Sequence, residues 1–373
     1  MIDEQVVKST EVETVADAES AKPKSGRTNG KNSSYISGGY FIPNKLKFEI
    51  EQVLQKNRDL AAFKKKKVGS ATQNKREVVI KGFFSDLLRL RFKIKSIYNL
   101  KEKHLIVVFN HLEKQGQSPA TIQNKISIIR IFCGWIGKRG MVRNSTHYVI
   151  NNASVMRTTV VQEDKSWQGK GVDVVAKLSD ITRKDFVVGI WLELCWAFGL
   201  RVSEAIMIKP CMSHEGDFIL VRQKTKGGRP RVVPVENDVQ KDVLERAKKI
   251  ADGKTGIIGY RGKTFKQKLR RVYTVLESLG ITLKEEGISA HGLRHQYMHE
   301  SFKRLTGVDA PIRGGDLSKV EKDELIVATL KLVERAGHSR ASIGSAYYGS
   351  RRIKSKTSNE TNNQNKEYDN ANE

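Results

Sequence analysis

The sequence predicts a mainly α-helical protein of two domains with one small β-hairpin, and three observations support this fold class. The chain has 373 residues, which suits two domains of roughly 100–200 residues each. Apolar residues recur at helical spacing along most of it. One segment, GDFILVRQKTKGGRPRVVPV, instead places a β-rich run on each side of Gly227 and Gly228, which is typical of a hairpin.

The composition indicates a polyanionic partner. Lys and Arg number 67 against 41 Asp and Glu, which gives a formal net charge of +26 and an isoelectric point near 9.9. A soluble protein this basic usually binds nucleic acid, and an anionic membrane surface is the second candidate. A charge that serves only solubility is the remaining alternative. Because 38% of the residues are hydrophobic, fully disordered and collagen-like chains are excluded.

Cysteine usage and hydropathy favour a cytoplasmic, nucleoid-associated protein with no membrane partner. The three cysteines, Cys133, Cys195 and Cys211, are odd in number and far apart, which disfavours a disulfide framework and fits a reducing compartment. The N-terminus lacks the basic and apolar regions of a secretory signal. The longest apolar stretch, residues 186–200, is short for a membrane span and contains Glu193, so we expect a buried core helix.

The first 74 residues divide into two segments with different expected structures. Residues 1–40 are polar, and we expect them to be disordered. Residues 41–74 form an expected basic helical extension, because Pro43 and Asn44 can begin a helix and apolar residues follow at helical spacing. The extension ends in the run Lys64–Lys67, which is either a solvated segment or a contact to a phosphate backbone.

Residues 75–150 are expected to form a small helical domain that binds DNA. Apolar residues at helical spacing predict one helix around residues 79–88 and a second around 105–112. A third begins at the Ser-Pro pair of residues 118–119, a favourable N-cap followed by proline at the first helical position. Residues 75–145 hold 15 Lys or Arg against 4 Asp or Glu, and a helical domain this basic is typical of a DNA clamp.

The remainder is expected to be a linker over residues 151–172, a second domain over 173–352 and a disordered tail over 353–373. The second domain contains the buried apolar helix and the hairpin. Further helices are expected near residues 236–251, 263–279, 291–305 and 318–335.

Four segments of the second domain carry side chains suited to phosphate chemistry. They are FGLRVSEAI with Arg201, the hairpin KTKGGRPRVVPV with Lys226, AHGLRHQYMHE with His291 and Arg294, and AGHSRASIGSAYYG with His338 and Tyr347. His291 and Arg294 are three positions apart and therefore share a helical face.

These residue types can act together on a phosphodiester. Two converging arginines can hold the non-bridging oxygens, because the guanidinium fork matches them. A nearby tyrosine is a candidate covalent nucleophile, although its free pKa of about 10 leaves little phenolate at neutral pH. Adjacent cations and a neutral histidine base would correct that, and a lysine could protonate the leaving alkoxide.

In this order the motifs resemble the tyrosine recombinases, the phage-integrase family. In that family an Arg stands in G-L-R-x-S-E, a Lys on a hairpin before R-x-V-P, a His and an Arg in H-x-L-R-H, and a His in G-H-S. A Tyr follows that last His by nine residues. The matching residues here are Arg201, Lys226, His291, Arg294, His338 and Tyr347. The segment SPATIQNKISIIRIFCGWIGKRGMV also resembles the family's core-binding domain, so the resemblance covers about residues 75–350.

The resemblance implies a C-shaped, two-domain clamp around duplex DNA, with a helical core-binding domain and a catalytic domain. Tyr347 would attack a phosphate and give a 3′-phosphotyrosyl bond. Arg201 and Arg294 would hold that phosphate with a hydrogen bond from His338, His291 would be the general base and Lys226 the general acid. Glu204 and His295 match positions that support the site. No metal, ATP or other cofactor is required, because the covalent bond conserves the phosphodiester energy.

The resemblance also implies the partners and the biological role. Double-stranded DNA recombination sites would be the substrate, and a homotetramer on two sites the active assembly. DNA-bending or excision proteins are expected accessory partners. We interpret the chain as the integrase of a mobile element. The alternatives are an Xer-like resolvase of DNA dimers with the same chemistry, and a DNA-binding relative that has lost catalysis.

Several local alternatives stay open at the level of sequence. Lys224 competes with Lys226, and Tyr348 with Tyr347. The Walker-like run GIIGYRGKT has the wrong glycine spacing for nucleotide binding, and the single C-x-x-H pair of residues 211–214 does not make a zinc site. The segment between the H-x-L-R-H and G-H-S motifs is longer than in compact family members, and we expect a surface loop and helix extension on the active-site side.

Overall fold

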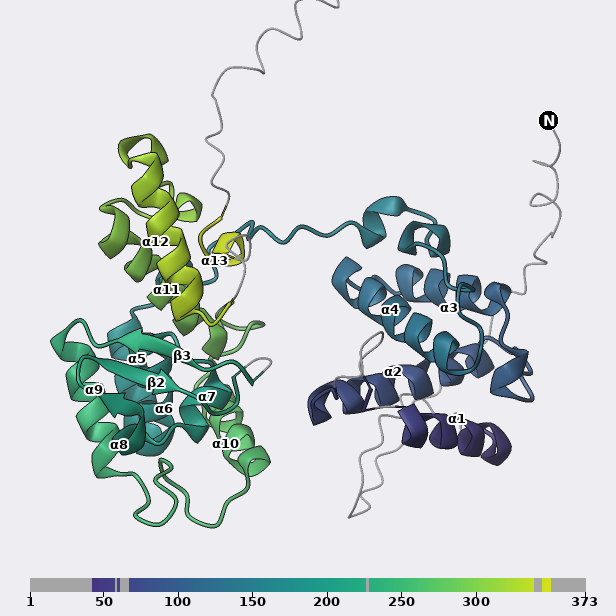
Figure 1. Cartoon of the computed structure of the whole chain (residues 1–373), viewed down its shortest axis with the longest axis horizontal. Helices are drawn as coiled ribbons and strands as arrows, with labels where there is room; N and C mark the ends of the chain where they lie inside the picture. Colours follow the sequence, from purple (N-terminus) through teal and green to yellow (C-terminus); the bar gives the residue numbers. More distant parts are fainter. Residues whose placement is uncertain (1–41, 58, 61–66, 226–227, 339–343, 350–373) are drawn as a thin grey trace, which may run out of the picture. The chain divides into compact units, whose positions relative to one another are not determined.

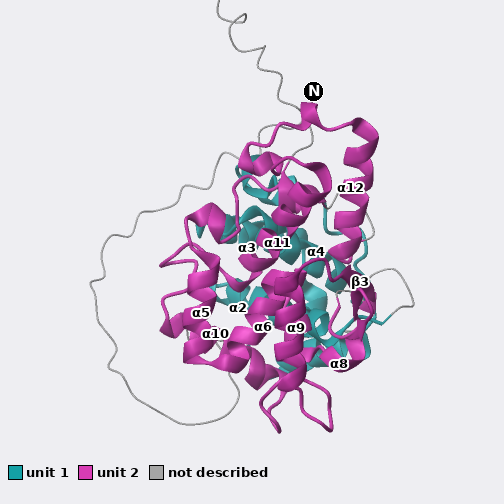
Figure 2. Cartoon of the chain, turned by 90° about the vertical axis from the view of Figure 1, so that its left-hand side faces the viewer, with its two compact units in different colours: residues 1–157 teal, residues 158–373 magenta. Residues whose placement is uncertain are grey.

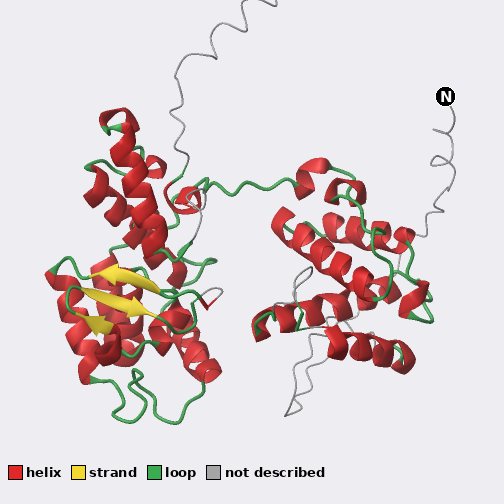
Figure 3. Ribbon diagram, viewed as in Figure 1, coloured by secondary structure: helices red, strands yellow, loops and turns green. Residues whose placement is uncertain are grey.

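The computed structural model describes residues 42–57, 59–60, 67–225, 228–338 and 344–349. The chain divides into two compact units, residues 1–157 and 158–373 (Figure 2). The predicted fold class is confirmed, because the described residues are mostly helical and contain one three-stranded antiparallel sheet (Figure 3). The expected disordered regions 1–40 and 353–373 lie outside the described residues.

Unit 1 is helical. Its elements are α1 (Asn44–Asn57), α2 (Ser70–Arg89), η1 (Ile97–Asn99), α3 (Glu102–Lys114), α4 (Pro119–Trp135), η2 (Ser145–Tyr148) and η3 (Asn152–Val155). The predicted start of α4 holds, since the Ser118 side chain accepts a hydrogen bond from the Thr121 backbone and proline occupies the first turn. Of the basic run Lys64–Lys67, the structure describes Lys67 alone.

A single apolar core holds the helices of unit 1 together. Phe84 of α2 meets Phe132 of α4 edge to face, with ring centres 5.7 Å apart. Leu46, Ile50 and Leu54 line one side of α1 and belong to the same core. The helix of the expected extension therefore packs into unit 1 with α2, α3 and α4.

Unit 2 surrounds a central helix. Its elements are η4 (Gln168–Lys170), α5 (Val174–Lys184), α6 (Phe186–Phe198), α7 (Val202–Met207), α8 (Pro210–Ser213), β1 (His214–Glu215), β2 (Phe218–Val221), β3 (Arg231–Pro234), α9 (Asp238–Lys249), α10 (Phe265–Ser278), α11 (Ala290–Thr306), η6 (Pro311–Arg313), η7 (Leu317–Lys319), α12 (Lys322–Arg335) and α13 (Ser345–Tyr348). Figure 1 labels the α-helices and the strands β2 and β3.

Helix α6 is the predicted buried core helix. Asp185 caps its first turn by accepting from the Val188 backbone, and Gly199 ends it in the left-handed conformation with φ of 60°. Almost every residue between is buried, and α5, α9 and α11 pack around it. A helix apolar on all sides is stable only in the interior of a domain.

The hairpin forms where the sequence predicts it. β2 and β3 pair antiparallel, with Ile219 opposite Val233, and Gly228 in the connection has a φ of 72° that suits glycine. The short strand β1 pairs with β2 and was not predicted. Lys226 and Gly227 lie outside the described residues.

The long segment before the G-H-S motif folds as η6, η7 and α12. This agrees with the expected loop and helix extension, and α12 packs on α11 and β3. η6 packs against α13, the short helix that contains Tyr347. Chain segments far apart in sequence therefore meet around α13.

Candidate active site

Arg201 is positioned by the turn that ends α6. A side chain at Gly199 would collide with the ring of Tyr297, so glycine is required there for space as well as for its positive φ. The turn places Arg201 at the N-cap of α7. Its backbone N–H donates to Glu204 Oε2 over 2.8 Å, and its Nη1 donates to Glu204 Oε1 over 2.6 Å.

Glu204 and Arg231 form a fully buried, two-point ion pair. Arg231 donates from Nη1 to Oε1 over 2.8 Å and from Nη2 to Oε2 over 2.7 Å. Burial alone would raise the pKa of Glu204, but the hydrogen bonds and charge of Arg231, with the charge of Arg201, outweigh it and lower the pKa. Glu204 therefore stays ionised and fixes Arg201.

Arg231 is a site residue to which sequence reasoning gave no role. It stands in the R-x-V-P pattern and opens β3, where Arg231 and Val233 are buried while Val232 is exposed. An arginine on the buried side of an alternating strand needs an anionic partner. The strand pattern could therefore have indicated a role for Arg231.

Arg294 is fully buried on α11, and each of its guanidinium nitrogens donates a hydrogen bond to a different acceptor. Nη1 donates to the Gly199 carbonyl, Nη2 to the Ala336 carbonyl, and Nε to the Tyr347 hydroxyl over 3.1 Å. The Ala336 carbonyl also accepts from Arg201 Nη2 over 3.3 Å. This shared acceptor brings the two guanidinium groups side by side.

The two adjacent tyrosines lie in different surroundings. The Tyr347 hydroxyl lies 3.1 Å from Arg294 Nε and 3.2 Å from His338 Nε2. The Tyr348 ring is buried against Phe302, with ring centres 5.2 Å apart. Of the two adjacent tyrosines, Tyr347 is the one with its oxygen among cationic and hydrogen-bonding groups.

His291 and His295 stack on the same face of α11, edge to face at 5.2 Å. Desolvation first, and then the charges of Arg294 and Arg201, lower the pKa of His291 to about 4. Burial lowers the pKa of His295 to about 3. Both rings are therefore neutral at pH 7. The ring centres of His291 and Tyr347 are 6.4 Å apart.

The structure thus gathers Arg201, His291, Arg294, His338 and Tyr347, with Glu204 and His295 beside them. Lys226 lies outside the described residues. Its rival Lys224 has a positive φ of 54°, and its Nζ lies 4.6 Å from the centre of the Phe265 ring.

Charge in this cluster is unbalanced. Among the described residues, Arg201 and Arg231 share the carboxylate of Glu204. Arg294 instead donates to two carbonyls and to the Tyr347 hydroxyl, and all four of these charged side chains are largely buried. A buried charge without a counter-ion is unfavourable. Burial lowers the pKa of Arg294, and its two arginine neighbours lower it further. The arrangement therefore favours an anion, and a phosphate has the oxygens that two guanidinium forks can hold.

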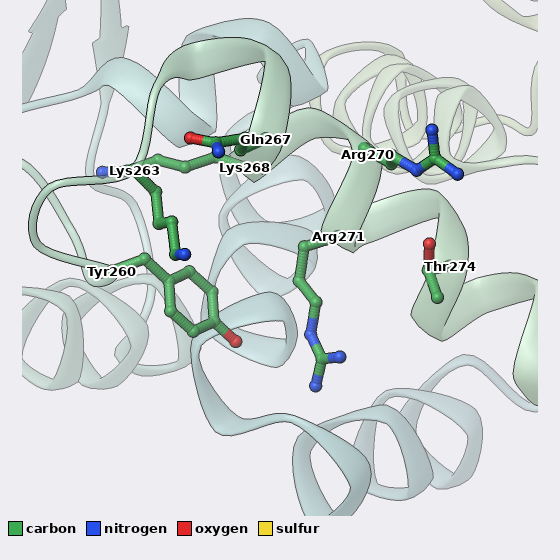
Figure 4. A pocket seen from close by; sticks show the side chains of 7 residues that line it. All are labelled: Tyr260, Lys263, Gln267, Lys268, Arg270, Arg271 and Thr274. Carbon is green, nitrogen blue, oxygen red and sulfur yellow. The ribbon is translucent and has the colours of Figure 1, made fainter. Parts of the chain in front are cut away.

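A second cationic region, which we call the α10 pocket, lies elsewhere in unit 2 (Figure 4). Its volume is about 310 Å³, and it is lined by Tyr260, Lys263, Gln267, Lys268, Arg270, Arg271 and Thr274. Arg271 Nε and the Tyr260 hydroxyl both donate to Asp185 Oδ2. Lys268 Nζ donates to the Gly259 carbonyl over 2.8 Å. Two of its cations are therefore used to hold the fold.

Neither a metal-binding cluster nor a membrane span is found in the described part of the chain. Among those residues, no cluster of three or more His, Cys, Asp or Glu side chains could hold a metal ion. Within the same residues, none of the helices combines the length and apolar character needed to cross a membrane.

Comparison with known families gives two matches that together span more than half of the chain. Residues 54–142 match the model described as "Phage integrase, N-terminal", and residues 155–300 match the one described as "Integrase". Tyrosine recombinase XerC of Corynebacterium glutamicum is 24% identical over 221 residues, which cover 58% of this chain and 70% of that protein. XerC of Neisseria gonorrhoeae is 24% identical over 204 residues, covering 53% and 65%.

Solved structures share the fold at lower sequence identity. A lambda integrase dimer bound to a core site is 15% identical with a TM-score of 0.54, covering 84% of this chain and 83% of that chain. A lambda integrase tetramer bound to a Holliday junction is 14% identical with a TM-score of 0.52, covering 83% and 81%. The Tn1549 transposon integrase in complex with transposon right end DNA is 15% identical with a TM-score of 0.51, covering 82% and 96%.

Proposed function

We propose, from the premise that this chain belongs to the tyrosine recombinase family, that it cleaves and rejoins duplex DNA at specific sites through a 3′-phosphotyrosyl intermediate. One observation carries the proposal. The Tyr347 hydroxyl lies between Arg294 and His338, beside a buried excess of positive charge that suits a phosphate.

The bond changes follow from this geometry. The Tyr347 oxygen forms a bond to phosphorus while the bond from phosphorus to the 5′-oxygen breaks, leaving a free 5′-hydroxyl. Arg201 and Arg294 stabilise the negative charge that develops on the non-bridging oxygens. Each terminal guanidinium nitrogen carries two hydrogens, so Arg294 can donate to a phosphate while it keeps its carbonyl partners.

Two proton transfers accompany the exchange. The phenol proton passes to a neutral histidine, for which we propose His291, whose pKa of about 4 leaves it free to accept at neutral pH. His338, already 3.2 Å from the phenol oxygen, hydrogen-bonds the reacting groups. Lys226 donates the proton to the leaving 5′-oxygen. A 5′-hydroxyl of a second strand then attacks the phosphotyrosine, which restores the phenol and joins the strands without metal or ATP.

We propose the integrase of a mobile element as the biological role, acting as a tetramer on two DNA sites with bending or excision proteins as accessory partners. The transposon integrase and the lambda integrase tetramer among the similar structures support this. The XerC relatives favour the second candidate, a resolvase of DNA dimers. The two differ in product: an integrase joins two separate DNA molecules, whereas a resolvase separates a head-to-tail dimer carried on one circle.

Nicked suicide duplexes drawn from the DNA that carries the gene test the chemistry directly. After cleavage, the nick lets the short fragment that carries the free 5′-hydroxyl diffuse away. The strand cannot then be rejoined, so a covalent protein–DNA adduct accumulates. We expect an adduct in the presence of a chelator, with binding that weakens steeply as salt rises because the chain carries a net charge of +26. A bound duplex that never becomes covalently attached would instead indicate the catalytically silent relative.

A further inference from the structure

The helix that contains Tyr347 cannot hold its own position. α13 spans Ser345–Tyr348, which is four residues. A single helical turn is unstable alone, because forming it fixes several residues for one hydrogen bond. The location of the Tyr347 hydroxyl therefore depends on the segments that contact α13.

Three segments from distant parts of unit 2 hold α13. The Val161 backbone N–H, in the segment that precedes η4, donates to the Ser345 carbonyl over 3.0 Å. His299 Nε2, on α11, lies 2.8 Å from the Tyr347 carbonyl. η6, from the long segment before the G-H-S motif, packs against α13. Figure 1 labels α11 and α13 in unit 2.

Of these contacts, the one from His299 acts on the nucleophilic residue itself. A carbonyl can only accept, so the hydrogen in this bond is on His299 Nε2. The ring is 2% exposed, so water competes little for the bond. Its other nitrogen, Nδ1, lies 3.4 Å from Asp164 Oδ1. Burial lowers the pKa of His299, while the Tyr347 carbonyl and Asp164 act in the opposite direction.

Asp164 is in turn fixed by the long segment. Arg313, the last residue of η6, donates from Nε to Asp164 Oδ2 over 2.8 Å and from Nη2 to Ser166 Oγ over 2.8 Å. The Ser166 backbone donates to Asp164 Oδ1 over 2.8 Å. Burial would raise the pKa of Asp164, but the hydrogen bonds from Ser166 and Arg313 outweigh it and lower the pKa. The Asp164 carboxylate is therefore charged and accepts a hydrogen bond at each oxygen, and it lies beside the His299 ring.

We propose that His299 is a positioning residue for the nucleophile, and that Asp164 and Arg313 hold together the two segments that lie next to its ring. In this arrangement His299 holds the Tyr347 backbone so that the phenol oxygen meets Arg294 and His338. The segment before η4 and the segment of η6 thereby control cleavage without touching the DNA phosphate. The inference rests on the proposed function, since it concerns the rate at which Tyr347 attacks.

The test compares two substitutions at His299 in the full chain. His299→Leu keeps bulk but removes the donor, whereas His299→Gln keeps an amide N–H that can reach the Tyr347 carbonyl. We measure single-turnover adduct formation on the suicide duplex, DNA affinity and melting temperature. Misplacing a reacting atom by about 1 Å costs on the order of 100-fold, so we expect a loss of this size in His299→Leu with unchanged DNA affinity. We expect His299→Gln to recover most of the rate.

Two controls separate positioning from general damage. Arg313→Ala is compared with Arg304→Ala, because Arg304 also bonds one carboxylate, Glu236, and one hydroxyl, Ser301, and neither of these belongs to the segment of Asp164. We expect Arg313→Ala to slow adduct formation and Arg304→Ala to leave it unchanged. A duplex with sulfur in place of the bridging 5′-oxygen needs no proton on its leaving group. This duplex should therefore restore the rate of adduct formation in Lys226→Ala but not in His299→Leu.

Each outcome decides one question. Wild-type protein that forms no adduct on any duplex would overturn the proposed function, whatever the variants do. Wild-type adduct with an equally fast His299→Leu would overturn the positioning role alone. Equal slowing in His299→Leu and His299→Gln, with a lower melting temperature in both, would assign His299 to stability and also overturn it.

Discussion

The Tyr347 cluster and the α10 pocket are both rich in cations, yet only one of them is arranged for chemistry. In the α10 pocket, Arg271 is neutralised by Asp185, Lys268 is bonded to backbone carbonyls, and most lining side chains are exposed. In the Tyr347 cluster, Arg201 and Arg231 share the carboxylate of Glu204, and the buried Arg294 donates to the phenol oxygen of Tyr347. Cation density alone therefore does not distinguish the two regions, and our proposal rests on the buried cations beside the Tyr347 hydroxyl.

The sharpest test of this comparison removes the phenol oxygen. We expect Tyr347→Phe to abolish the covalent adduct while DNA binding survives, because no other hydroxyl stands between Arg294 and His338 among the described residues. Tyr348→Phe is the matched control, since that ring packs against Phe302. Gel analysis of the two variants on the suicide duplex gives the answer. An adduct that persists in Tyr347→Phe would place the nucleophile elsewhere.

The second test contrasts one arginine from each region. We expect Arg294→Ala to lower the rate of adduct formation by about 10²–10³-fold, since preorganised donors at a developing oxyanion contribute that much. Arg271→Ala, in the α10 pocket, should leave the rate unchanged and lower only stability, because Asp185 loses an ion-pair partner. Single-turnover rates and melting curves measure both. A large rate loss in Arg271→Ala would break the distinction between the regions.

The third test concerns the single carboxylate of the cluster. Glu204→Gln keeps the shape but removes the charge that Arg201 and Arg231 share. Because a buried hydrogen bond to a charged group is worth about 1.5–3 kcal/mol, we expect a loss of at least this size in unfolding free energy. Denaturant titration measures it. An unchanged free energy of unfolding would mean that the buried ion pair does not stabilise unit 2.

The last expected effect is absent at neutral pH and appears only on acidification, as a pH dependence of stability from His295. Burial lowers its pKa to about 3 in the folded protein from 6.5. The unfolded chain therefore binds the proton first as pH falls, so the free energy of unfolding decreases from about pH 6.5 down to about pH 3, by at most ~1.4 kcal/mol per pH unit. His295→Gln should flatten that part of the profile in denaturant titrations. An identical profile in the variant would contradict a buried neutral ring.

Sequence periodicity predicted the helices well because most of them bury one apolar side. The start of α4 and the end of α6 were predictable from Ser118 and Gly199, since a cap and a left-handed turn are local requirements. The set Arg201, His291, Arg294, His338 and Tyr347 was predictable because its motifs keep a fixed order and spacing.

Contacts between distant segments could not be predicted in the same way. Arg231 meets Glu204 across 27 positions, and Arg313 meets Asp164 across 149. Neither spacing follows a helical or strand period, so pairing emerges only when the fold brings the segments together. The role of His299 could not be predicted either, because in the sequence it is one more polar residue of α11. Only the structure shows its contact with the Tyr347 carbonyl.

The most direct measurement is mass spectrometry of the peptide that carries DNA after trapping on a suicide duplex and digestion with protease and nuclease. The account predicts a nucleotide joined through its 3′-phosphate to the oxygen of Tyr347. A nucleotide on Tyr348, on a serine, or on any residue remote from Arg201 and Arg294 would contradict it.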